Sequence, residues 1–157
     1  MRVPLKRIGA VGVILLVVLM VAALILGILV DTDSSSEKFT KDFVQQAINR
    51  YNSSGREATI DHYNSPGSVN GQWYVFIIDE NETMVAHATR KDRIGTTRED
   101  RVDATGYYYG DEFASATEDG KWVSYSFTNP TTGQIGKKHT WIVKHDGLFF
   151  GSGWYED

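Results

Sequence analysis

The pattern of apolar and polar residues divides the chain at residue 30. Residues 8–30 carry no charged or strongly polar side chain, and three basic residues lie among the seven that precede them. A run of about 20 apolar residues is long enough to cross a bilayer as a helix. By the positive-inside tendency, residues 1–7 stay in the cytoplasm and everything after residue 30 is extracytoplasmic. The pattern therefore predicts a single-pass protein of the cell membrane.

The alternative to an anchor is a cleavable signal peptide, whose apolar core has about 7–15 residues. The run here is longer, and residues 26–30 offer no Ala-x-Ala cleavage site. We therefore expect an uncleaved signal anchor over 8–30, a polar linker over 31–36 and one domain over 37–157.

After the linker, the apolar spacing first indicates helices. Phe39, Phe43, Ala47 and Tyr51 recur every four residues, with further apolar residues beside them, so one stripe of this helix should face a core. Ser34 and Glu37 form a capping box at its start. Residues 52–55 end it, and residues 56–63 should form a second, shorter helix.

From residue 73 onward the pattern changes to that of strands. Residues 73–78 are apolar without alternation, as expected of a central strand covered on both faces, while residues 121–128 alternate between two faces. Asp146-Gly147 is a strong hairpin signal. The expected elements are strands over 73–78 and 84–88, a charged loop over 89–105, a short helix over 110–117, and strands over 121–128, 137–145 and 148–155. The fold class is therefore α+β, with a long helix packed on one face of a mostly antiparallel sheet of about five strands.

Composition narrows the function of the exported part. All 20 acidic residues but only 13 of the 16 basic ones lie after residue 30, which gives this part a formal charge of −7. An acidic domain is a poor candidate for binding nucleic acid. The chain has no cysteine, so its stability must come from its core, and every Trp, Tyr and Phe lies after residue 30.

Several ordered strings in the C-terminal third resemble one family. They are G-K-W-V-S-Y at 120–125, N-P-T-T-G at 129–133, K-H-T-W at 138–141 and G-S-G-W-Y at 151–155. Upstream, Ile78-Asp79, Val85-Ala86-His87 and Ile94-Gly95 look like the paired strands and following loop of the same pattern. Together they resemble the single Cache family, the PAS-like extracytoplasmic sensor domains of prokaryotic chemoreceptors and sensor kinases. The similarity covers most of residues 36–156.

Two features depart from the family pattern. Ala88 follows His87 where the family usually has proline. Cache domains normally sit between two membrane helices, whereas no second apolar run follows residue 30 in this sequence. We therefore expect the signal to pass to a membrane receptor or kinase partner, or to a second copy in a homodimer.

The resemblance implies a pocket for a small organic acid or amino acid on the sheet face away from the long helix. Lys138 is the first candidate, because it alternates with Thr140 and Ile142 and should point to one sheet face. A ligand carboxylate there would pair with an ammonium that is costly to bury alone. The alternative is an exposed lysine at the start of a strand.

Five further residues are candidates for the same pocket. Tyr125 and Trp122 lie on opposite faces of their strand, so only one of them should line the pocket, and either would serve equally as core. His87 could donate to a ligand oxygen or be a structural histidine. Arg90, in the charged loop, could clamp a carboxylate or be solvated. Tyr107, with the two tyrosines after it, lies where a lid would form.

Signals for catalysis are weak. The Ser, His and Asp residues have no nucleophile-elbow or other supporting motif, and the four histidines are not spaced as metal ligands. We therefore expect no enzyme activity, no cofactor and no metal. The main alternative to a ligand-binding sensor is a structural or protein-interaction module that kept the Cache fold without a ligand. A pocket lined by Lys138 and other polar side chains would distinguish the two.

Overall fold

The structure is a computed structural model that describes residues 34–156. Residues from Glu37 onward form one compact unit. The predicted cytoplasmic segment 1–7 and the predicted anchor 8–30 lie outside the described residues. Across the part that is described, no helix is both long and apolar enough to cross a membrane. Residues 34–36, the end of the predicted linker, are already helical and begin a long helix over 34–54.

A five-stranded antiparallel sheet forms the body of the domain, in the order β2-β1-β5-β4-β3. The last strand therefore lies at the centre of the sheet, between the first strand and the fourth. The strands are β1 (Phe76–Ile78), β2 (Met84–His87), β3 (Lys121–Thr128), β4 (Ile135–His145) and β5 (Leu148–Tyr155). The helices besides the long one are α2 (Arg56–Tyr63), η1 (Pro66–Ser68), η2 (Lys91–Arg93), η3 (Arg98–Asp100) and α3 (Gly110–Ala114). The predicted α+β class is confirmed.

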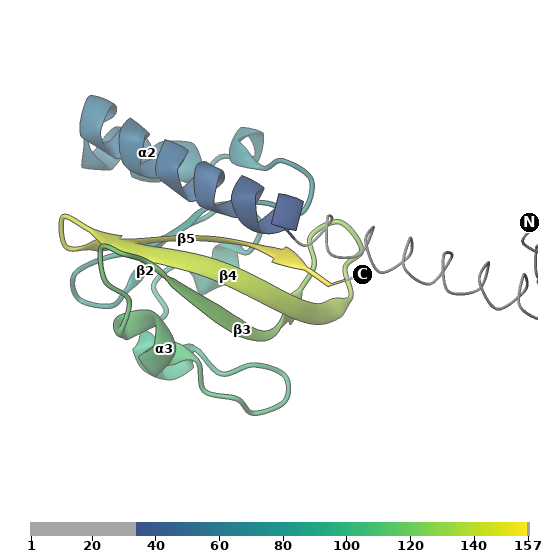
Figure 1. Ribbon diagram of the computed structural model, residues 1–157. Coiled ribbons are helices and arrows are strands. Elements are labelled where there is room, and N and C mark those ends of the chain that lie inside the picture. Colours follow the sequence, from purple (N-terminus) through teal and green to yellow (C-terminus); the bar gives the residue numbers. More distant parts are fainter. Residues whose placement is uncertain (1–33, 157) are drawn as a thin grey trace, which may run out of the picture. The chain divides into compact units, whose positions relative to one another are not determined.

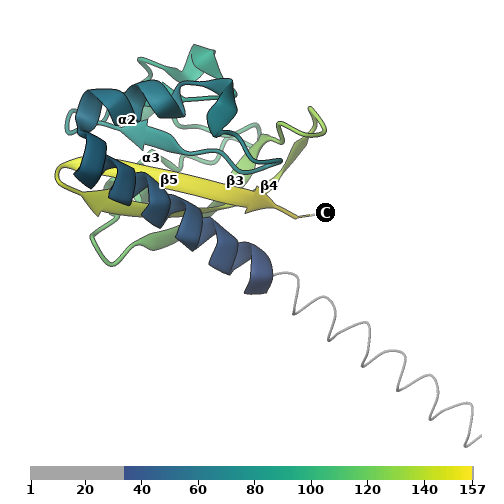
Figure 2. The ribbon, with the colours of Figure 1, turned by 90° about the horizontal axis from the view of Figure 1, so that it is seen from above.

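The long helix packs on one face of the sheet (Figure 1) and, seen from above, passes over β5 (Figure 2). Val44, Ala47 and Ile48 are buried on it against apolar residues of the central strands, among them Ile77 and Phe150. The buried stripe is thus rotated slightly from the predicted one, and Phe39 remains 37% exposed. Burial of this stripe is what holds the helix on the sheet.

A second layer of apolar residues covers the opposite face, on which α3 lies in Figure 1. Phe76 of β1 stacks on Phe113 of α3, with ring centres 5.3 Å apart. Gly151 of β5 faces this layer, and a Cβ added there would lie 2.1 Å from the Phe76 ring. The glycine is therefore needed for close approach of a ring to the backbone, as glycines in strand interiors often are. Among residues 34–156 no long helix covers this face, which leaves room for polar side chains among the rings.

Most differences from the expected elements concern their ends. β1 begins at Phe76 rather than at residue 73, because Trp73 pairs with Asn70 through two backbone hydrogen bonds of 2.9 Å and so closes a tight turn. β4 begins at Ile135, two residues before the predicted start, and α3 ends at Ala114. The bounds of α2, β3 and β5 match the expected ones.

Candidate ligand-binding site

Lys138 is buried in the layer opposite the long helix. It faces the same side of β4 as Thr140 and Ile142, and only 1% of it is exposed. Its Nζ atom lies 2.7 Å from the Tyr74 hydroxyl oxygen. No carboxylate forms an ion pair with Lys138 anywhere in residues 34–156. A buried lysine with this single oxygen partner is unusual, since buried lysines are normally paired.

Aromatic rings enclose the amine of Lys138. Its Nζ lies 4.0 Å from the centre of the Tyr74 ring, and the ring centres of three further residues lie within 5.7 Å: Phe76, Phe127 and Tyr155. The faces of such rings attract a cation, but each contributes only about 0.5–2 kcal/mol. The rings therefore stabilise a positive charge on the amine, but less than an anionic partner would.

A chain of hydroxyl groups leads away from Lys138. The Tyr74 oxygen lies 3.3 Å from the Tyr155 oxygen, and Tyr155 donates a hydrogen bond of 2.8 Å to the Thr128 carbonyl. Because the Tyr155 proton is used in its bond to Thr128, the Tyr74 hydroxyl donates to the Tyr155 oxygen. The Tyr74 oxygen in turn accepts from the Lys138 amine. The chain connects the buried amine to the end of β3.

Burial dominates the ionisation of this cluster. It lowers the pKa of Lys138 to about 7, and it raises the pKa values of Tyr74, Tyr125 and Tyr155, so these phenols keep their protons at neutral pH. It also lowers the pKa of His87 well below its usual value, with Lys138 as the next cause, which keeps the imidazole neutral. The cluster therefore offers several neutral donors around one titratable amine.

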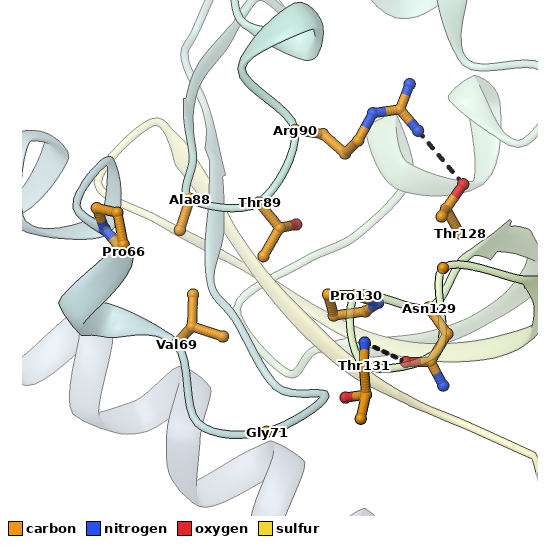
Figure 3. A pocket seen from close by; sticks show the side chains of 11 residues that line it. Pro66, Val69, Gly71, Ala88, Thr89, Arg90, Thr128, Asn129, Pro130 and Thr131 are labelled. Carbon is orange, nitrogen blue, oxygen red and sulfur yellow. Dashed lines mark hydrogen bonds between the residues drawn. The ribbon is translucent and has the colours of Figure 1, made fainter.

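A cavity of about 520 Å³ opens beside this cluster (Figure 3). Thr89, Arg90 and Thr128 contribute its polar groups nearest the hydroxyl chain, and Arg90 Nη1 lies 3.3 Å from Thr128 Oγ1. Thr128, which lines the cavity, accepts through its carbonyl from Tyr155, and the Tyr155 oxygen lies 3.3 Å from the Tyr74 oxygen. The remaining lining residues are Pro66, Val69, Gly71, Ala88, Asn129, Pro130, Thr131 and Gly133. The cavity wall is thus two hydrogen bonds away from the hydroxyl group that contacts Lys138.

A smaller cavity of about 150 Å³ shares Arg90 and Thr128 with the first one. Arg90 and Arg93 both line it, and each guanidinium lies within 6 Å of the Phe127 ring centre. Arg93 also lies 3.3 Å from the Tyr109 hydroxyl. Two arginines therefore flank the aromatic cluster from the loop after β2, and their charges favour an anion.

Four of the predicted residues lie on this side of the sheet. Tyr125 is directly opposite Lys138 in the β3–β4 register, is buried, and its ring stacks on Tyr109 at 4.0 Å. His87 is buried, with its ring 4.7 Å from that of Tyr74. Arg90 reaches the rim of both cavities, where Asp92 also pairs with it at 2.6 Å.

Two of the predicted residues, Trp122 and Tyr107, do not lie with the others. Trp122 lies on the opposite face of the sheet, where its ring packs 5.3 Å from that of Trp141, because it has the opposite strand parity from Tyr125. Tyr107 is 43% exposed on its loop. Its neighbour Tyr109 is the buried one. Tyr108, between them, pairs with Val102 across the turn over residues 104–106, and the Tyr109 N–H donates to the Arg101 carbonyl at 2.9 Å.

Sequence reasoning missed Tyr74, Tyr155 and Arg93 as members of the cluster. Tyr155 lies directly across the β4–β5 register from Lys138, so counting back from the Asp146-Gly147 turn would have placed the two together. Tyr74 gave no such signal, because the strand predicted over residues 73–78 shows no alternation. Within residues 34–156, no three His, Asp or Glu side chains gather in a way that could hold a metal.

Comparisons with known proteins agree with this architecture. The family model described as "Single Cache domain 2" matches residues 34–155. No curated protein matches the chain. One similar solved structure is a methyl-accepting chemotaxis protein from Vibrio parahaemolyticus, with 18% identity, a TM-score of 0.68, and coverage of 81% of this chain and 93% of that one.

Two further solved structures have the same fold. One is described as the structural basis for carboxylic acid recognition by a Cache chemosensory domain, with 18% identity, a TM-score of 0.62, and coverage of 81% of this chain and 97% of that one. The other is the periplasmic sensor domain of a chemotaxis protein, with 18% identity, a TM-score of 0.61, and coverage of 82% and 98%. The match of the family model over most of the chain confirms the resemblance seen in the sequence. This chain belongs to the Single Cache domain 2 family.

Proposed function

We propose that this chain is a membrane-anchored extracytoplasmic sensor domain that binds a small organic acid or amino acid beside Lys138 and signals through a partner protein. The observation that carries the proposal is the burial of Lys138 without a carboxylate among the described residues. A fold retains such a group at a cost in stability, which is typical of functional sites. A ligand carboxylate would supply the missing charge.

The neighbours of Lys138 suit the same class of ligand. The phenols of Tyr74 and Tyr155 keep their protons and so can donate to carboxylate oxygens, and Arg90 adds a positive charge at the rim. Hydrogen bonds between charged and neutral partners of this kind are stronger than those between neutral ones. A similar domain is itself described as recognising carboxylic acids, which supports this assignment for the present chain.

The cavity of about 520 Å³ suggests the route by which a ligand reaches Lys138. Lys138 itself does not line the cavity. A ligand that enters through the cavity would approach the amine by replacing the hydrogen bonds of Thr128 with Arg90 and Tyr155. Each of these neutral or singly charged hydrogen bonds contributes only about 0.5–3 kcal/mol, so an incoming carboxylate can replace them. The predicted anchor over residues 8–30 would hold the domain at the membrane.

The test is a thermal-unfolding screen of the full chain in detergent against organic acids and amino acids. A ligand at about 100 times its dissociation constant adds about 2.7 kcal/mol to the free energy of unfolding, which gives a clear rise in melting temperature. Lys138→Met should abolish that rise. Lys137→Met is the matched control, because Lys137 lies on the opposite face, where it pairs with Glu156. Equal rises in melting temperature for both variants would show that Lys138 is not part of the binding site.

The alternative is a structural module that kept the fold without a ligand. One observation favours it: the Tyr74 hydroxyl already occupies the position next to the Lys138 amine, and rings close around it. Under this alternative no acid or amino acid in the screen raises the melting temperature, whereas Lys138→Met still raises it because a desolvated amine has been removed.

A further inference from the structure

The surroundings of the Lys138 amine determine its charge before any ligand arrives. Its one hydrogen-bond partner is the Tyr74 oxygen at 2.7 Å, and aromatic rings surround it. The nearby acidic side chains are otherwise engaged: Asp92 pairs with Arg90, and Asp103 accepts the backbone N–H of Ser126 at 2.8 Å. The amine thus has no anionic neighbour at hydrogen-bonding distance within the described residues.

A neutral amine suits these surroundings better than an ammonium. Burying an ammonium without a counter-charge costs several kcal/mol, and a lysine normally avoids this by losing its proton. The contact with Tyr74 does not require the charge, because a neutral amine still has N–H bonds to donate. The lowering of the Lys138 pKa to about 7 by burial agrees with this geometry.

The other titratable groups around the site keep a constant charge near neutral pH. On β2, His87 stays neutral because burial and Lys138 lower its pKa. Before β1 and on β3 and β5, the phenols of Tyr74, Tyr125 and Tyr155 stay protonated. The remaining charged or titratable neighbours, all in the loops after β2, are Arg90, Asp92, Arg93, Asp103 and Tyr109. Lys138 is therefore the one group of the described cluster poised to change charge in this range.

We propose that carboxylate binding at this site is coupled to the uptake of one proton, which converts the neutral amine of Lys138 into the ammonium that pairs with the ligand. This inference rests on the proposed function and specifies how its site is regulated. The balance is one carboxylate, one amine and one proton on the free side, and one ammonium–carboxylate pair on the bound side. The same balance holds whether the proton comes from solvent or arrives on the acid. Ligand binding by the domain therefore depends both on the concentration of the carboxylate and on the pH.

Isothermal titration calorimetry of the full chain in detergent tests the coupling, with acetate, propionate, succinate and glycine as probes. Each probe is titrated at the same pH in phosphate and in imidazole, which both buffer from about pH 6 to about pH 8 and differ in ionisation enthalpy. At about pH 8 the buffer dependence should show net proton uptake on binding, and this uptake should fall at about pH 6, where more of the free amine is already protonated. Affinity should be weaker at the higher pH, by up to about tenfold per pH unit once most of the free amine is neutral.

Lys138→Arg provides the matched variant, since a guanidinium stays charged and should bind without any buffer dependence. A second measurement needs no ligand: the lysine Cε resonances of the free protein are followed against pH by NMR, with Lys138→Met assigning the signal. Titration near neutrality supports the proposal, and titration above about pH 9 overturns it. Binding heats that do not depend on the buffer overturn the coupling alone. Absence of binding by every probe overturns the proposed function together with the coupling.

Discussion

Lys138 lies among four aromatic rings with one hydroxyl oxygen at 2.7 Å, and the same surroundings that prepare it for an anion make it unfavourable for folding. Folding removes its amine from water and offers no opposite charge in return. A side chain of this kind lowers the free energy of unfolding and favours the binding of an anion. Its effect on the two properties can be separated by substitution.

Lys138→Met should be at least as stable as the wild type near neutral pH. The pKa of Lys138 is lowered by burial from 10.5 in the unfolded chain to about 7 in the fold, so the unfolded state binds more protons between these values. Wild-type stability therefore rises with pH across this window, by up to about 1.4 kcal/mol per pH unit, and the advantage of the Met variant shrinks accordingly. Urea unfolding of both proteins from about pH 7 to about pH 10.5 measures the difference.

Lys137→Met is the control for this prediction. Lys137 is exposed and forms a surface ion pair with Glu156 at 2.7 Å, so its removal should change stability little and with no comparable trend across this window. A constant difference between wild type and Lys138→Met over the same window would show that the buried amine is charged in the folded protein.

At the residue scale, the sequence predicts the face of Lys138 but not its partners. Strand alternation predicts that Lys138 points to one sheet face and that Tyr125 and Trp122 point to opposite faces. It does not tell which of the two shares the face of Lys138, and the β3–β4 register places Tyr125 there. Tyr74 belongs to a segment that is buried on both faces, where alternation carries no information. Placing it at the amine requires the strand order, which depends on long-range pairing rather than on local pattern.

At the element scale, burial on one stripe fixes the long helix to the sheet. Ile48 is 5% exposed and packs with the apolar residues of the central strands. Ile48→Ala should lower the free energy of unfolding by about 2–5 kcal/mol, because it removes buried methyl groups and leaves a cavity. Gln45→Ala, on the exposed side of the same helix, should stay within about 0.5 kcal/mol of the wild type. Equal losses in chemical unfolding would contradict the observed orientation of the helix.

The glycines of β5 make a second prediction at this scale. A Cβ at Gly151 would lie 2.1 Å from the Phe76 ring, so Gly151→Ala forces rings or backbone to move and should cost about 1–3 kcal/mol. At Gly136 of β4 the nearest atom to a new Cβ is on Tyr155 at 3.6 Å, an ordinary contact, and Gly136→Ala should be nearly neutral. Melting temperatures of the two variants decide the matter. A Gly151→Ala variant as stable as the wild type would mean that the Phe76 ring is free to move aside.

The elements themselves were predictable where the pattern was local. β3 and β5 follow from alternation and from the Asp146-Gly147 turn, and the bounds found are the bounds expected. β1 is shorter than its apolar run, because Trp73 bonds back to Asn70 through the backbone. A sequence pattern reports which residues avoid water, and it does not report which backbone partner each one finds.

For the whole molecule, the apolar run over residues 8–30 and the basic residues before it predict the orientation in the membrane. Protease added to intact spheroplasts should remove the domain over 37–157, because it is expected outside the cytoplasm. Protection in intact spheroplasts, with digestion only after lysis, would reverse the orientation. Recovery of a free domain in the exported fraction would show that the segment is cleaved.

The order of strands in the sheet also has a consequence for how the domain is made. β5 pairs with β1 on one side and with β4 on the other, so residues 148–155 complete the sheet from its centre. During synthesis, the β1–β2 pair and the β3–β4 pair can form early, but they have no strand between them until β5 emerges. Joining strands so distant in sequence is slow, and until then the inner edges of both pairs offer unpaired backbone groups to other chains. The domain should therefore be most prone to aggregation before β5 is in place.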